Sequence, residues 1–141
     1  MLPRSVIIIG LYTLLSLGAG LAFWGWLQLR SFLKTYDSIR SPIEFDAFKR
    51  VVKTNMYLAL AIIVVFGLVL VLASTGIYGG MLGWMEVLVM VAITGPICSL
   101  VGIKITNVEK KMKAILLGDE NLREEFDHVV RRWNSSPFPD W

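Results

Sequence analysis

The chain has few of the residues that metal proteins and many enzymes rely on. Its 141 residues include one cysteine, Cys98, and one histidine, His128. A single cysteine cannot form an internal disulfide, and metal or nucleophilic use of Cys98 would need partner side chains that its apolar surroundings lack. His128 lies outside the apolar runs, so we do not expect histidine ligation of a haem or chlorophyll inside a membrane. The sequence predicts no metal site.

Motifs of common enzyme chemistry are also missing. The chain has no G-x-x-x-x-G-K-[ST] phosphate loop, no G-x-S-x-G turn and no H-E-x-x-H pair. The adjacent carboxylates Glu124 and Glu125 point apart on a helix, whereas general acid–base catalysis needs convergent groups in a pocket. A membrane enzyme would instead have to use Glu86 or Asp46 at the membrane interface. We therefore expect a protein without catalytic activity.

Long apolar runs dominate the composition. Apolar residues make up 55% of the chain and the mean hydropathy is +0.63, whereas soluble domains contain about 45–50% apolar residues. About 20 apolar residues in a helix cross the hydrocarbon core of a bilayer. Runs at about 6–29, 56–73 and 85–103 therefore predict an all-α integral membrane protein with three transmembrane helices. The first run is too long for a signal peptide, so we expect it to be retained.

Local signals divide the rest of the chain. Ser41-Pro42-Ile43-Glu44 combines an N-cap serine, a proline at the first helical position and a capping-box glutamate. It predicts one long helix that rises from Pro42 into the second run, with a bend at Asn55 left open. The first helix is expected to continue through about Arg40. Gly118 and Asp119 are expected to end one helix and cap the next. The predicted parts are a three-span domain, 1–104, with an inside helical segment, 30–55; an amphipathic helical tail, 105–134, broken at 118–119; and an extended peptide, 135–141.

The distribution of charge predicts the orientation. Six Lys and Arg residues lie between the first two runs and seven follow the third run from Lys104 onward, whereas the glycine-rich segment 74–83 has none. By the positive-inside rule, the first connection and the C-terminus lie on the cytoplasmic side and the N-terminus lies outside. We expect a bacterial inner membrane or its organelle equivalent. The basic residues flank the runs and form no single patch, so nucleic acid is not an expected partner.

The third run contains a helix breaker, Gly95-Pro96. Proline has no N–H, so Pro96 should release the carbonyl of Ala92 and kink the helix, with Thr94 as a candidate to satisfy that carbonyl. The kink is either a packing device or a hinge in an ion path, and the second interpretation would need ionisable groups that the first two runs lack. Small residues that allow close helix contact recur nearby and in the first run: Ala92, Gly95, Ser99, Gly102, Ser16 and Gly20.

The tail carries an apolar stripe at helical spacing. Its residues are Leu122, Phe126, Val129, Val130 and Trp133, and the proline-rich end adds Phe138 and Trp141. Three alternatives are open: the stripe lies on the membrane, packs on segment 42–54 of the same chain, or docks on a partner subunit. Acidic and basic residues are mixed on the opposite face, unlike the Lys- and Arg-rich face of a lipid binder, so we favour contact with protein and expect docking on a partner.

These features together favour a non-catalytic accessory or structural subunit of a larger membrane complex, of respiratory or photosynthetic type. The expected partners are membrane lipids and other integral membrane subunits in a hetero-oligomer. No cofactor is predicted; bound lipid is expected, and a peripheral pigment or quinone is left open. The alternative is a homo-oligomeric channel or small transporter whose kinked third span lines a pathway.

Overall fold

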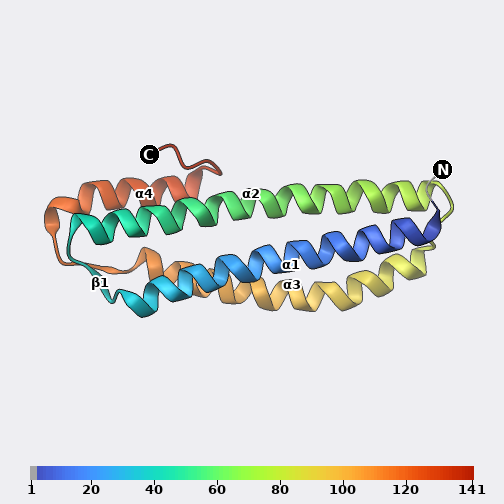
Figure 1. Ribbon diagram of the computed structural model, residues 1–141, viewed down its shortest axis with the longest axis horizontal. Helices are drawn as coiled ribbons and strands as arrows, with labels where there is room; N and C mark the ends of the chain where they lie inside the picture. Colours follow the sequence, from blue (N-terminus) through green and yellow to red (C-terminus); the bar gives the residue numbers. More distant parts are fainter. Residues whose placement is uncertain (1–2) are drawn as a thin grey trace.

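The computed structural model describes residues 3–141 as an all-α protein (Figure 1). Its α-helices are α1 (Arg4–Thr35), α2 (Pro42–Tyr78), α3 (Trp84–Lys113) and α4 (Arg123–Ser135). Its short elements are the strands β1 (Ser38–Ile39) and β2 (Leu116–Leu117) and the 3-10 helix η1 (Glu120–Leu122). Helices α1, α2 and α3 are long and apolar enough to cross a membrane. The predicted fold class is confirmed: this is a helical, multi-pass membrane protein.

The three long helices run along the long axis of the molecule, with α1 between α2 and α3 (Figure 1). Helix α1 makes extensive contact with both neighbours. Helix α4 lies along the first part of α2 at one end of the molecule. We call this the polar end; it comprises β1, β2, η1, α4 and the adjoining turns of α1, α2 and α3. The α2–α3 turn lies at the opposite end.

The start of α2 follows from its capping sequence. The Ser41 hydroxyl accepts a hydrogen bond from the backbone N–H of Glu44 at 3.3 Å, and Pro42 occupies the first helical position. The Glu44 carboxylate accepts from the backbone N–H of Arg40 at 2.6 Å. From this cap α2 continues for 37 residues, which confirms one long helix. It ends at Tyr78 with Gly79 as its C-cap, and the φ of +66° at the following Gly80 favours glycine.

The end of α1 and the end of α3 differ from the prediction. Helix α1 ends at Thr35 and does not continue to Arg40, because Tyr36 has an extended backbone. Strand β1 then pairs in parallel with β2, and the N–H of Gly118 donates to the carbonyl of Ile39 at 2.7 Å. Ile39 is fully buried, so burial of this side chain accounts for an extended segment where helical spacing suggested a helix.

Because of the pairing between β1 and β2, the helix that enters the tail ends before Gly118. Helix α3 is continuous from the membrane to Lys113, and its C-cap is Ala114, not Gly118. Gly118 instead packs against the side chain of Arg40, where an added Cβ would lie 2.9 Å from Cγ. Asp119 is an N-cap as predicted, but of the 3-10 helix η1: its carboxylate accepts from the backbone N–H of Asn121 at 3.0 Å. Helix α4 follows from Arg123 without a side-chain cap.

Two hydrophobic clusters stabilise the fold. The larger lies at the polar end and is built around phenylalanines: the Phe48 ring centroid is 5.2 Å from that of Phe126 and 5.8 Å from that of Phe32. The smaller lies at the α2–α3 turn and contains Ile7, Leu11, Leu82 and Met90. An ion pair between Arg4 and Glu86 ties α1 to α3 at that end. Long apolar stretches between the clusters stay exposed, as expected for helices surrounded by lipid.

Candidate functional site

The small residues predicted to pack in the third span lie on the outside of the bundle. Ala92, Pro96, Ser99 and Gly102 are exposed. A Cβ added at Gly95 or Gly102 would meet no atom within 4 Å. Among the described residues 3–141, this face of α3 therefore has no close helix neighbour. Contact with another protein stays a prediction for it.

Pro96 lies inside α3, and the helix continues past it. The predicted role of Thr94 is not seen. Its hydroxyl donates to the carbonyl of Met90 at 2.7 Å, not to that of Ala92. A threonine in a helix commonly bonds the carbonyl four residues earlier, which is the geometry found here.

In the first span, different glycines make the helix contact. Ser16 and Gly20 are exposed, and a Cβ at Gly20 would meet nothing within 4 Å. Gly18 and Gly25 are buried against α2 instead. A Cβ at Gly18 would lie 3.5 Å from Val65 Cγ1. The sequence contains a signal for this contact, because glycines seven residues apart share a helix face. The four-residue spacing of Ser16 and Gly20 does not mark the contact.

A cavity of about 390 Å³ lies between the three spans. Its walls are largely apolar side chains such as Val65, Phe66 and Ile97, and its few polar groups include Ser16 and Thr94. None of the lining residues is Asp, Glu, Lys, Arg or His. Such a cavity suits an apolar chain; a path for ions would need polar or charged walls. Cys98 and Gly102 also line it.

A polar junction that the sequence analysis missed joins the helices where the membrane segment meets the polar end. Asn55 is 7% exposed, and its side-chain N–H donates to the Glu109 carboxylate on α3 at 3.1 Å. Gly25 on α1 leaves room for it, since a Cβ there would lie 3.2 Å from Asn55 Oδ1. The sequence feature that points to this junction is a single asparagine, Asn55, directly before the second apolar run.

Lys113 extends this junction to α4. Its ammonium lies 4.0 Å from the Glu109 carboxylate and donates to the Asn134 side chain at 2.7 Å. It also lies 4.6 Å from the centroid of the Trp133 ring, within cation–π range. Side chains from α2, α3 and α4 thus form one connected polar chain.

The apolar stripe of the tail packs within the chain. Phe126 and Val129 are buried in the polar-end cluster, and Leu122, Val130, Trp133 and Trp141 pack against it. The Lys49 ammonium also donates to Glu125 on α4 at 2.9 Å. The contact made is therefore the one with α2 of the same chain, one of the three alternatives. Phe126 and Val129 offer no surface to a partner, and partner docking stays a prediction for Phe138, which is 60% exposed.

The beginning of the tail carries a short ion pair. Arg123 donates to both carboxylate oxygens of Glu120, at 2.8 Å from Nε and 3.0 Å from Nη2. These hydrogen bonds, and the charge of the guanidinium, lower the pKa of Glu120 below its usual value. The pair is exposed, so its contribution to stability is small.

No family model, no curated protein and no solved structure matches the chain. Within the described residues, no group of three or more His, Cys, Asp and Glu side chains is placed to hold a metal ion. The features that bear on function are therefore the exposed face of α3, the apolar cavity and the polar end.

Proposed function

We propose that the protein is a structural, non-catalytic subunit of a larger membrane complex, and that the outer face of α3 contacts a transmembrane helix of a partner subunit. The observation that carries the proposal is the row Ala92, Gly95 and Ser99, with Gly102 at its edge beside the cavity. These residues share one side of α3, and that side has no close neighbour within the described chain.

Packing in a bilayer explains why such a face suits a partner helix. Lipid tails are as apolar as leucine, so helices associate through close van der Waals contact, and small residues allow their backbones to approach. Helix α1 uses glycines in this way against α2, at Gly18 and Gly25. Helix α3 also has small residues along one face, and no other helix of the described chain covers that face.

The polar end supports a structural role. Most of its apolar side chains are packed in one internal cluster, and the connected chain through Asn55, Glu109 and Lys113 ties three helices together. A partner would therefore meet a preformed unit. We extend the proposal to a hetero-oligomer of respiratory or photosynthetic type, in contact with membrane lipid and with its C-terminus on the cytoplasmic side.

The test is purification of the complex from native membranes. The full chain is tagged at the N-terminus, extracted in a mild detergent, and analysed by native mass spectrometry and absorption spectroscopy. We expect a stoichiometric set of larger subunits. A spectrum of haem, flavin or chlorophyll would identify the type of complex.

A pair of double variants tests the surface itself. Gly95→Leu with Ser99→Leu fills the α3 face, where a Cβ at Gly95 meets no atom within 4 Å, and should release the partner subunits. The matched control, Gly67→Leu with Ser74→Leu, fills an exposed face of α2 with the same residue types and should leave the complex intact. Equal recovery of partners with both variants would contradict the proposed contact.

A colourless homo-oligomer would overturn the accessory-subunit proposal. The alternative, a homo-oligomeric channel or small transporter, then makes a prediction of its own. The purified protein in liposomes should carry ions or solutes, and Pro96→Ala should change the flux.

A further inference from the structure

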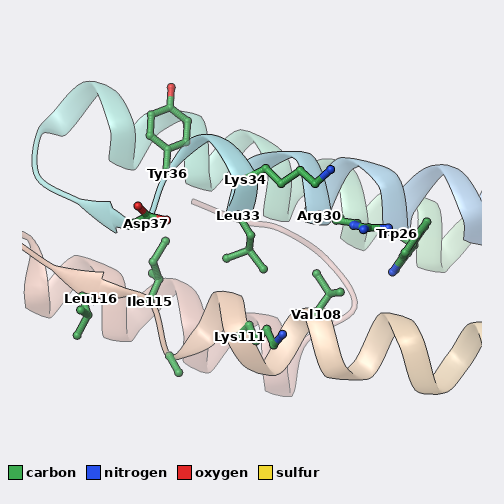
Figure 2. Close-up of a pocket in the computed structure, with 11 residues that line it drawn as sticks. Trp26, Arg30, Leu33, Lys34, Tyr36, Asp37, Val108, Lys111, Ile115 and Leu116 are labelled. Atoms are coloured by element: carbon green, nitrogen blue, oxygen red, sulfur yellow. The ribbon is translucent and has the colours of Figure 1, made fainter.

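A pocket with unpaired positive charge opens at the polar end, between α1 and α3. Its volume is about 470 Å³, within the range of about 300–1,000 Å³ that is typical of small-ligand sites. Arg30 and Lys34 line it from α1 and Lys111 from α3, with Leu33 and Val108 between the two helices (Figure 2). Asp37 is the one carboxylate among the lining residues, so positive charge is in excess.

The pocket lies where the membrane segments end. The apolar run of α1 ends at Leu29 and that of α3 ends at Ile103. Trp26 also lines the pocket, with the Arg30 guanidinium 5.0 Å and the Lys104 ammonium 5.8 Å from its ring centroid. Tryptophan concentrates at the headgroup level of bilayers. A bilayer around the three spans would therefore place the pocket at the level of the headgroups.

Among the described residues, no ion pair neutralises the cations of this pocket. Elsewhere at the polar end some basic side chains form ion pairs: Lys49 with Asp46 and Glu125, Lys113 with Glu109, Arg123 with Glu120, and Arg132 with Asp140. Others, such as Lys53, Lys110 and Arg131, form none within residues 3–141, but they lie outside the pocket. Within residues 3–141, Arg30, Lys34 and Lys111 form no such pair. Arg30 and Lys34 are also four residues apart on one helix, where like charges repel. A bound anion would relieve that repulsion.

We propose that this pocket binds the phosphate group of an anionic phospholipid. Arginine presents a planar fork of donors that matches phosphate oxygens, and the two lysines add point charges. Leu33, Val108 and the buried Ile115 provide an apolar wall for the glycerol and the first carbons of the acyl chains. Basic pockets between transmembrane helices are known binding sites for lipid headgroups. Free phosphate shares the headgroup's charge but gains nothing from the apolar wall.

The test is lipid binding to the full-length protein, purified in a neutral detergent and measured by native mass spectrometry. The probes are phosphatidylglycerol and phosphatidylcholine with identical acyl chains. We expect the wild type to bind phosphatidylglycerol roughly 10-fold more tightly. The triple variant Arg30→Gln, Lys34→Gln, Lys111→Gln should lose this preference.

Two control variants separate the pocket from overall charge and from misfolding. Lys53→Gln with Lys110→Gln and Arg131→Gln removes the same residue types and the same charge from exposed positions outside the pocket, and should keep the preference. Lys34→Arg with Lys111→Arg keeps the positive charge of the pocket, so this variant should also prefer phosphatidylglycerol. The proposed site would be refuted if the first control variant lost the preference for phosphatidylglycerol. It would also be refuted if the triple variant kept that preference.

Excess inorganic phosphate distinguishes the two sources of the anion. If the ligand is a lipid, phosphate should leave the binding of phosphatidylglycerol unchanged within about 2-fold, because the apolar wall contributes only to the lipid. Displacement of the lipid by inorganic phosphate would show that the pocket recognises a soluble anion, and would overturn the lipid assignment.

Discussion

The two halves of this molecule are stabilised in different ways. At the polar end, residues from α1, α2, α3 and α4 enclose eleven buried side chains, several of them aromatic. Along the membrane-spanning part, the contacts are narrow: α1 lies between α2 and α3, and most apolar side chains face outward. The comparison shows the effect of the solvent. Water drives apolar side chains into a common core, whereas lipid leaves only close backbone packing and polar contacts to hold helices together.

The largest test of this comparison removes an aromatic ring from the polar-end core. Phe48 is fully buried between Phe32, Phe45 and Phe126. Phe48→Ala should lower the free energy of unfolding of the polar end by about 3–5 kcal/mol, through lost burial and the cavity left behind. Detachment of α4 should appear as faster tryptic cleavage at Arg131 and Arg132.

The control for this variant is Phe23→Ala in the membrane segment. Phe23 is 53% exposed on the lipid side, so its removal should change stability by less than about 0.5 kcal/mol. Equal losses from the two substitutions would mean that the two halves are stabilised alike.

A second test compares two glycines on α1. Gly18→Leu should force α1 and α2 apart, because even a Cβ there would contact Val65 at 3.5 Å. Overpacking of this kind costs about 1–3 kcal/mol. Gly20→Leu, two residues away, meets open space and should be neutral. Thermal unfolding in detergent, followed by circular dichroism, measures both; equal melting temperatures would contradict the assigned interface.

A third test breaks the polar junction between the halves. Asn55→Ala removes the hydrogen bond to the Glu109 carboxylate, and hydrogen bonds to charged groups contribute about 1.5–3 kcal/mol. Glu109 keeps Lys113 nearby at 4.0 Å, so we expect a loss near the lower end of that range. The control is Asn107→Ala on the exposed surface of α3. The readout is the same melting experiment, and a neutral Asn55→Ala would refute a stabilising junction.

The smallest expected effect concerns the exposed pair Glu120–Arg123. The lowered pKa of Glu120 means that the pair favours the folded state above the usual glutamate pKa, and that this contribution is lost as the pH falls through the lowered value. In an NMR titration, the carboxyl of Glu120 should titrate below the usual range for glutamate. Arg123→Gln should return it to that range, and an unchanged pKa in this variant would rule out the guanidinium as the cause.

The sequence predicted the parts of the fold that depend on local chemistry. The three apolar runs and the cap at Ser41 depend on residues that are neighbours in the sequence, and both predictions were right. The N-cap at Asp119 was right for the 3-10 helix η1 but not for α4. The long continuous α2 followed from the absence of any breaker after Pro42.

Contacts between distant segments could not be predicted in the same way. The pairing of Ile39 with Leu117 joins residues far apart in the sequence, and neither dipeptide has a strand signal of its own. In the spans, lipid-facing and helix-facing residues are equally apolar, so periodicity does not show which face of α1 contacts α2. The choice of Gly18 over Gly20 is therefore decided by tertiary packing, as is the placement of the tail stripe on α2.

The unbroken course of α2 has a mechanical consequence. Its 37 residues make a rod of about 55 Å, well beyond the roughly 30 Å of a bilayer's hydrocarbon core. The rod has no joint between the part that crosses the membrane and the part that carries α4. A tilt of about 10° around its turn end would move the Pro42 end sideways by about 10 Å. Helix α2 is therefore a lever, and a change in bilayer thickness that alters its tilt moves the whole polar end with it.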